Sequence, residues 1–136
     1  MTEPAAGIRE VPHDRRYTPD HLWVLLEGDR ATVGVTPFGA DLLGEVVYLD
    51  LPEGGTTLRR GEPFGAIESA KTVSELVVPI DGDVVARNDR ALETPALVNE
   101  SPYEDAWLIR LRVTHTVELD ALLSPEAYES SLRDVT

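Results

Sequence analysis

The sequence predicts a mainly β fold, a flattened β-barrel or sandwich of two small sheets with short helices at the C-terminal end. Many short runs of β-branched and aromatic residues are separated by turns that contain glycine or proline. Helix-start signals are few, and before the last twenty residues only one is clear. The length of 136 residues fits a single domain, 1–136, that can bury a core.

The first third of the chain predicts a lead-in, a hairpin and a helix. Residues 1–16 are polar with two prolines, and we expect a loose lead-in before a β-core over 17–113. Two strands, 21–26 and 31–35, flank a turn that contains glycine, which is typical of a hairpin. Thr36 and Pro37 then supply an N-cap and a first-turn proline for a short helix that ends at Gly44.

The middle of the chain predicts a single strand followed by a second hairpin. Residues 45–50 are the single strand, and 52–55 form a turn cluster. Residues 62–68 and 72–78 are two strands joined by a short turn at 69–72. This turn lacks the Asn-Gly or Asp-Gly pair that tight hairpins favour.

The last third predicts two more strands and the terminal helices. The strands are 83–87 and 107–113, and between them we expect a brief helical turn at 88–92 and a proline-broken loop over 94–103. Two short helices, 117–123 and 125–132, make up a helical end over 116–133. Ser124 is the expected cap of the second helix and Pro125 its first residue.

A short internal echo links two of these segments. Gly-Glu-Val-Val at 44–47 recurs as Gly-Asp-Val-Val at 82–85, on either side of the second hairpin. Four residues do not prove a duplication, but the echo suggests two similar sheet halves with the hairpin tip near their axis.

Lys71, in the turn of the second hairpin, is the only lysine in the chain. The chain has twelve basic residues in all, so the other eleven are arginines. Arginine replaces lysine where only a charge is wanted, but its guanidinium stays protonated and cannot be acylated as an amine can. The lone lysine is therefore a candidate for modification at an exposed tip; a chance survivor of an arginine-biased composition is the alternative.

Composition excludes several classes of function. The net charge of -13 opposes binding to nucleic acids and to anionic membranes, and it suits partners with basic docking surfaces, although an acidic surface also serves solubility. There is no cysteine, no apolar run near the roughly 20 residues of a membrane span, and no visible signal peptide, so we expect a cytoplasmic protein. His13, His21 and His115 lack metal-ligand spacing, and we expect neither a metal site nor catalytic residues.

Several motifs, taken in order, give the chain a family resemblance over about 17–128. They are Asp-Leu-Leu-Gly-Glu-Val-Val-Tyr at 41–48, Leu-Pro-Glu-Gly-Gly at 51–55, Glu-Ser-Ala-Lys at 68–71, Pro-Ile-Asp-Gly-Asp-Val at 79–84, and Leu-Val-Asn-Glu-Ser-Pro-Tyr at 97–103, with Trp107 after them. In this order and spacing the chain resembles the H protein of the glycine cleavage system, a lipoyl carrier. The resemblance implies a lipoyl-type fold.

The resemblance also implies a cofactor and a set of partners. Lipoate-attaching enzymes would join lipoic acid to the amine of Lys71 as an amide. A pyridoxal-phosphate (PLP) glycine decarboxylase would load the aminomethyl group of glycine onto it. A tetrahydrofolate-dependent aminomethyltransferase would remove that group, and an FAD-dependent dihydrolipoyl dehydrogenase would reoxidise the arm. The carrier would do no bond chemistry of its own and would be a mobile monomer.

Three other readings stay open. Biotin carriers share the fold but typically have methionine on both sides of the lysine, where this chain has Ala70 and Thr72. Leu22 and Phe38 stand where the family usually has a glutamate and a histidine near the cleft that shelters the loaded arm, so the chain could be an H-like paralogue that relays lipoate or serves another redox partner. An unmodified binding module would leave Lys71 free.

Overall fold

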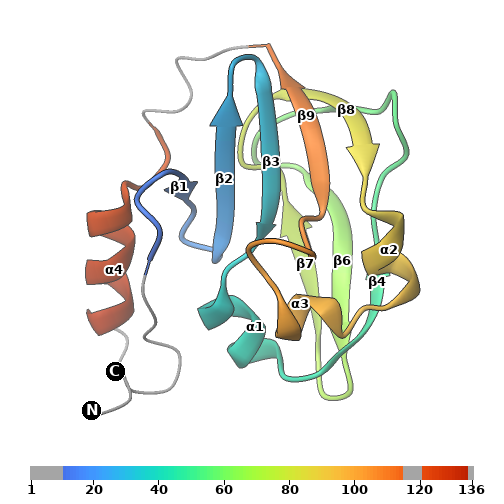
Figure 1. The fold of residues 1–136 in the computed structure, drawn as a ribbon, viewed down its shortest axis with the longest axis vertical. Coiled ribbons are helices and arrows are strands. Elements are labelled where there is room, and N and C mark those ends of the chain that lie inside the picture. Colours follow the sequence, from blue (N-terminus) through green and yellow to red (C-terminus); the bar gives the residue numbers. More distant parts are fainter. Residues whose placement is uncertain (1–10, 115–120, 135–136) are drawn as a thin grey trace.

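Two antiparallel sheets pack face to face in a computed structural model that describes residues 11–114 and 121–134 (Figure 1). One sheet has six strands in the order β1-β2-β3-β9-β8-β5, and the other has three in the order β4-β6-β7. The strands are β1 (Arg16–Tyr17), β2 (Leu22–Glu27), β3 (Arg30–Val35), β4 (Val46–Asp50), β5 (Thr57–Leu58), β6 (Pro63–Ser69), β7 (Val73–Val77), β8 (Gly82–Arg87) and β9 (Ile109–Val113). The helices are α1 (Pro37–Leu43), α2 (Asp89–Glu93), α3 (Leu97–Glu100) and α4 (Pro125–Asp134).

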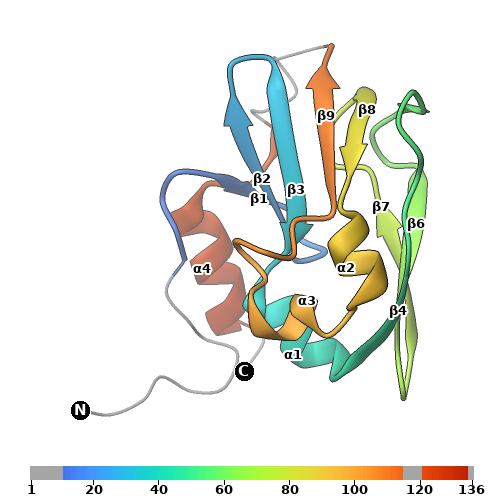
Figure 2. The ribbon, with the colours of Figure 1, turned by 45° about the vertical axis from the view of Figure 1, so that its right-hand side comes forward.

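The predicted sandwich of two sheets is confirmed, and among the described residues the sheets do not join into a closed barrel. The six-stranded sheet stands between α4 on one side and the three-stranded sheet on the other (Figure 2). The two copies of the internal echo lie in different sheets, in β4 and in β8, but the unequal sheet sizes give no sign of two similar halves.

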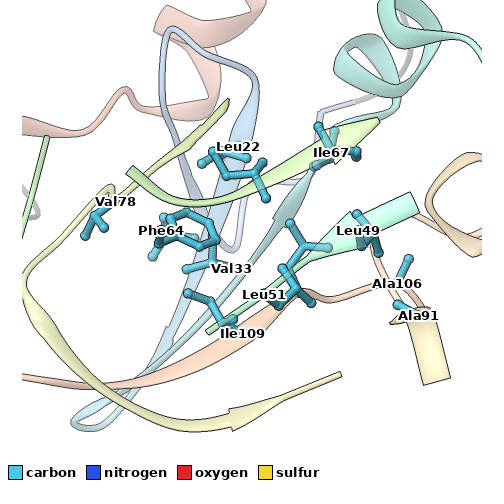
Figure 3. Packing of buried hydrophobic residues seen from close by; sticks show 14 of the residues in the cluster. Leu22, Val33, Leu49, Leu51, Phe64, Ile67, Val78, Ala91, Ala106 and Ile109 are labelled. Atoms are coloured by element: carbon cyan, nitrogen blue, oxygen red, sulfur yellow. The ribbon is translucent and has the colours of Figure 1, made fainter. Parts of the chain in front are cut away.

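The main core fills the space between the two sheets. Side chains from the inner faces of both sheets meet there, among them Leu22 and Val33 from the larger sheet and Leu49, Phe64 and Ile67 from the smaller one (Figure 3). Alternation along each strand sends one set of side chains inward and the other outward. The core therefore fixes which face of the β6–β7 hairpin is buried.

A second, smaller cluster joins α4 to the outer side of the six-stranded sheet. Its buried members are Val11, Tyr17, Trp23, Phe38, Tyr128 and Leu132. The rings of Tyr17 and Tyr128 stack with their centroids 4.7 Å apart and their planes 6° apart. Val11 is 2% exposed, so the last part of the expected loose lead-in is packed against the domain; residues 1–10 lie outside the described part.

The sequence missed one helix and two short strands. Residues 94–103 hold α3, which has no side-chain cap and forms because Leu97 and Val98 are buried. β1 and β5 have two residues each, too few to leave a pattern in the sequence. Of the expected helix at 117–123, residues 117–120 lie outside the described part of the chain, while Leu123 forms a β-bridge with Tyr17. No helix among the described residues is long and apolar enough to cross a membrane.

Candidate functional site

Lys71 lies at the tip of the β6–β7 hairpin, at the lower end of the view in Figure 1, and it is exposed. Ser69 organises the turn: its backbone N–H donates to the carbonyl of Thr72 (2.8 Å), and its hydroxyl oxygen accepts from the N–H groups of Lys71 (3.3 Å) and Thr72 (3.2 Å). No described residue of this turn has a positive φ, so the Asn-Gly pair of a tight hairpin is not needed. The predicted hairpin and its exposed lysine are confirmed.

The side chain of Lys71 passes over Gly44, the residue that ends α1. A Cβ atom built on Gly44 would lie 3.2 Å from Cε and 3.6 Å from Nζ of Lys71. Gly44 has φ 82° and ψ -159°, a region open almost only to glycine. The glycine therefore serves both the chain reversal after α1 and the close approach of the lysine stem.

Asn99 holds the segment beneath the lysine from the other side. Its side-chain amide donates to the carbonyl of Gly44 (2.8 Å) and accepts from the N–H of Val46 (2.9 Å). These two bonds pair one backbone carbonyl and one backbone N–H at the edge of β4, as the backbone of a neighbouring strand would do. Asn99 thereby ties α3 to the turn on which Lys71 rests.

A cavity of about 310 Å³ opens near the base of the hairpin, between α1, the start of β2 and strands β6 and β7. Its apolar walls include Leu22, Leu43, Ile67 and Leu76. Its polar lining residues are Asp20, His21, Ser74 and Glu75. The cavity offers a mainly apolar space close to the hairpin that carries the exposed amine.

The two positions that depart from the family pattern have different surroundings. Leu22 is 3% exposed and lines the cavity, so the wall is apolar at the position where the resemblance implies a carboxylate. Phe38 does not line the cavity. Its ring lies in the second cluster, 4.8 Å from the ring of His21, so Phe38 lies behind a residue of the cavity wall rather than in the wall itself.

His21 lines the cavity from a strained backbone. It is the one non-glycine residue of the described chain with a positive φ, at 69°. Its Nδ1 lies 2.9 Å from the hydroxyl of Tyr128, and that hydroxyl lies 2.7 Å from the Thr36 hydroxyl. Burial lowers the pKa of His21, against a smaller opposing effect of Asp20, and burial also raises the pKa of Tyr128 far above its ordinary value.

The outer face of the smaller sheet is apolar and acidic around the hairpin. Strand register places Tyr48, Glu68 and Val73 in one row across the three strands, and Asp50, Ala66 and Glu75 in the next. Tyr48 is 56% exposed and Val73 is 63% exposed. Along the chain no arginine occurs in 31–58 or 61–86, and Lys71 is the only basic residue there.

The remaining candidates form no second site. His13 pairs with Glu126 at 3.2 Å on the surface, and His115 lies outside the described residues. No group of three or more acidic, histidine or cysteine side chains in 11–114 and 121–134 could hold a metal ion. Sequence reasoning missed the roles of Ser69, Asn99 and Tyr128. Ser69 and Asn99 lie within the motifs 68–71 and 97–103, but the role of each of the three residues depends on its contacts in the folded chain.

Comparison with known proteins assigns the family. The family model described as glycine cleavage H-protein matches residues 15–135. The glycine cleavage system H protein of Brevibacillus brevis is 45% identical over 125 residues, which cover 92% of this chain and 99% of the relative. The probable glycine cleavage system H protein of Haloarcula marismortui is 46% identical over 123 residues, covering 90% and 97%.

A solved structure agrees with this assignment. The crystal structure of a glycine cleavage system H protein from Mycobacterium marinum matches with a TM-score of 0.80 and 36% identity, covering 92% of this chain and 99% of that one. The β-sandwich, the lysine hairpin and these relatives together show that the chain belongs to the glycine cleavage H-protein family.

Proposed function

We propose that this chain is the lipoyl carrier of a glycine cleavage system and that Lys71 is its attachment site. The single observation that carries the proposal is the position of the only lysine, exposed at the tip of a hairpin, in a chain of the H-protein family. An amine at a tip can enter the active site of an attaching enzyme without unfolding the domain. Residues 1–136 act as one domain in this proposal, since the family model covers nearly all of them.

The residues present fit a lipoyl group. The Lys71 amine is free to form an amide, and the cavity near the hairpin base has apolar walls that suit a hydrocarbon chain and a dithiolane ring. A lipoyl group held on Lys71 would supply a disulfide that can accept the aminomethyl group left when glycine loses CO2, and a dithiol that can be reoxidised once that group is removed. In this proposal the chain itself tethers the arm, offers it a partly apolar cavity, and performs no bond chemistry.

The partners in this proposal are four kinds of enzyme. They are the lipoate-attaching enzymes, the PLP-dependent glycine decarboxylase, the tetrahydrofolate-dependent aminomethyltransferase and the FAD-dependent dihydrolipoyl dehydrogenase. The tether raises the effective concentration of the arm at each partner to the order of mM. A monomer suits this role, because each active site must receive the hairpin alone.

The acidic outer face of the smaller sheet is the docking face that we assign to these partners. Its exposed Tyr48 and Val73 provide apolar contact beside Lys71, and nearby carboxylates such as Glu75 provide charge. Residues 31–58 and 61–86 contain no arginine, so a partner with a basic surface meets no positive charge there except that of Lys71. Lipoylation removes the charge of Lys71 as well.

The intact mass of the protein, purified from cells that make lipoate, tests the attachment. We expect a shift of one lipoyl or octanoyl group, which is lost in Lys71→Arg because a guanidinium cannot be acylated. A biotinyl shift would move the chain to the carboxylase carriers. An unmodified mass, in cells that lipoylate their other carriers, would contradict the proposal and favour a plain binding module.

A second candidate function rests on Leu22. Because a leucine lines the cavity where the family usually has a glutamate, the lipoylated chain could serve as a lipoate relay or as a carrier for another redox partner. Incubation of the lipoylated protein with glycine decarboxylase and glycine separates the two functions. Uptake of an aminomethyl group supports the glycine cleavage role, and failure to load supports the relay.

A further inference from the structure

The hydroxyl of Tyr128 connects the C-terminal helix with two parts of the cavity wall. It lies 2.9 Å from Nδ1 of His21 and 2.7 Å from Oγ1 of Thr36. Thr36 is the N-cap of α1, and its Oγ1 also accepts from the N–H of Gly39 at 3.1 Å. His21 and Gly39 both line the cavity, so the buried phenol is bonded directly to one of these wall residues and linked to the other through Thr36.

Counting hydrogens gives this chain of bonds a direction. The N–H of Gly39 can only donate, so Thr36 Oγ1 accepts there and keeps its own proton to give. Thr36 is 1% exposed, and Tyr128 is the one acceptor for this proton among residues 11–114 and 121–134. The Tyr128 hydroxyl then donates its hydrogen bond to Nδ1 of His21. This nitrogen must therefore be unprotonated, and the ring proton of the neutral imidazole lies on Nε2.

The backbone around His21 makes such a constraint necessary. Its φ of 69° is a conformation that side chains other than glycine adopt only at a cost, and the surrounding structure must enforce it. A Cβ atom on Gly39 would lie 2.8 Å from Cβ of His21, so α1 and His21 are in close packing contact. A loss of order at either one would therefore move the other.

We propose that Tyr128 is a positioning residue for the cavity beside the lysine hairpin, where it fixes His21 as the Nε2–H tautomer and anchors the start of α1. The role for the carried arm rests on the proposed function, because that cavity is the space we assign to the loaded arm. The role for His21 and α1 stands on the contacts alone. Tyr128 itself lies in the second cluster and does not touch the cavity.

Two measurements on the unmodified protein test the positioning directly. Nitrogen-15 NMR of the His21 ring should show an unprotonated, hydrogen-bonded Nδ1 in the parent protein, and a shifted Nδ1 resonance in Tyr128→Phe and Thr36→Val. Amide hydrogen exchange at Gly39 should become faster in the same two variants. Thr36→Ser keeps the hydroxyl and should restore both signals, which a general loss of packing at this position would not do.

Tyr17→Phe is the matched control, because Tyr17 stacks on Tyr128 but donates its hydroxyl proton to the carbonyl of Pro12 instead. It should leave the His21 resonance and the Gly39 exchange unchanged. A protonated Nδ1 in the parent protein would overturn the proposal. So would a Tyr128→Phe protein, folded by circular dichroism, with unchanged Nδ1 and Gly39 signals.

The arm supplies a third measurement. In the lipoylated protein loaded with aminomethyl, release of that group by water should be about fivefold faster in Tyr128→Phe, the factor expected from one lost hydrogen bond. Tyr17→Phe should release it at the parent rate. An unchanged rate in Tyr128→Phe would overturn the positioning role for the arm. If even the parent protein does not load, the proposed function fails, and the NMR and exchange results still decide whether Tyr128 positions His21 and α1.

Discussion

The stem of Lys71 lies across the α-carbon of Gly44, so these two residues constrain each other. We predict that Gly44→Ala destabilises the fold by about 1–3 kcal/mol, because the backbone at φ 82° and ψ -159° excludes a Cβ. The added methyl group would also meet Cε of Lys71 at 3.2 Å. Urea unfolding measures the first effect, and the rate of lipoylation by an attaching enzyme measures the second.

Gly28→Ala is the control for Gly44→Ala. Gly28 also has a positive φ, at 65°, but nothing lies within 4 Å of an added Cβ there. This variant should lose stability and keep the parent rate of lipoylation. If Gly44→Ala were also lipoylated at the parent rate, the contact between Gly44 and the lysine would have no part in modification.

His21 gives the fold a dependence on pH. Burial lowers the pKa of this imidazole below the 6.5 of the unfolded chain, so below pH 6.5 the unfolded state binds more protons than the folded state. We predict that the free energy of unfolding falls as pH drops from 6.5 toward the lowered pKa, and that above 6.5 His21 adds no slope. Urea melts between pH 5 and 7.5 should show a smaller slope in His21→Gln; an identical slope would contradict the assignment.

Single residues differ in how far the sequence reveals them. The exposed position of Lys71 at a hairpin tip could be predicted because strand-forming runs flank its turn, and composition singles it out as the only lysine. Asn99 and Tyr128 could not, because their partners lie far along the chain: 53 and 55 residues away for Asn99, 92 and 107 for Tyr128. No local pattern encodes a contact of that length, and only the packed fold brings the groups together.

At the level of elements, local cap and proline signals predicted the helices that such signals start. Thr36 and Pro37 start α1 as expected, with the Thr36 side chain accepting from Gly39 N–H, and Pro125 begins α4. α3 was missed because it has no such cap and is held by the burial of Leu97 and Val98. Asn99 belongs to this helix, so its role at the site was missed for the same reason: α3 leaves no local signal in the sequence.

The link between α3 and the edge of β4 is open to a direct test. Asn99→Ala removes two hydrogen bonds, to Gly44 and Val46, and should lower stability by about 1–2 kcal/mol at about 1 kcal/mol for each bond. Because these bonds hold the segment under Lys71, the KM of lipoylation should rise as well. Chemical denaturation and lipoylation kinetics with varied protein concentration measure the two effects.

Asn99→Asp separates the two bonds. It keeps an acceptor for the N–H of Val46 and loses the donor to the carbonyl of Gly44, which then faces a carboxylate. We expect a stability below that of the parent protein and a KM shift at least as large as in Asn99→Ala. A stability loss in both variants with no change in KM would limit Asn99 to a structural role.

Over the whole molecule, basic residues are kept away from the part that carries Lys71. α1, β4, β6 and β7 contain no arginine, although the chain has eleven. Within 11–114 and 121–134, four of the five large apolar side chains that are exposed belong to these same elements: Leu42, Val47, Tyr48 and Val73. The net charge of -13 predicted a preference for basic partners but not a location. The location follows from the fold, which gathers these segments beside one hairpin.

This distribution predicts that charge reversal weakens partner association at one end of the molecule only. Glu75→Lys, on the outer face of the smaller sheet, should slow association of the unmodified protein with a lipoate-attaching enzyme by up to about thirtyfold. Two unit charges 4 Å apart in water interact by about 1 kcal/mol, and the reversal replaces one such attraction by one repulsion, a change of about 2 kcal/mol. Glu27→Lys makes the same change in net charge at the far end of β2, away from the hairpin tip (Figure 1). Stopped-flow association at low salt should separate the two variants, and their difference should shrink as added salt shortens the Debye length to about 8 Å at 0.15 M. Equal slowing by both would mean that total charge, rather than the acidic face beside Lys71, guides the partner, and the docking face proposed for the smaller sheet would then be wrong.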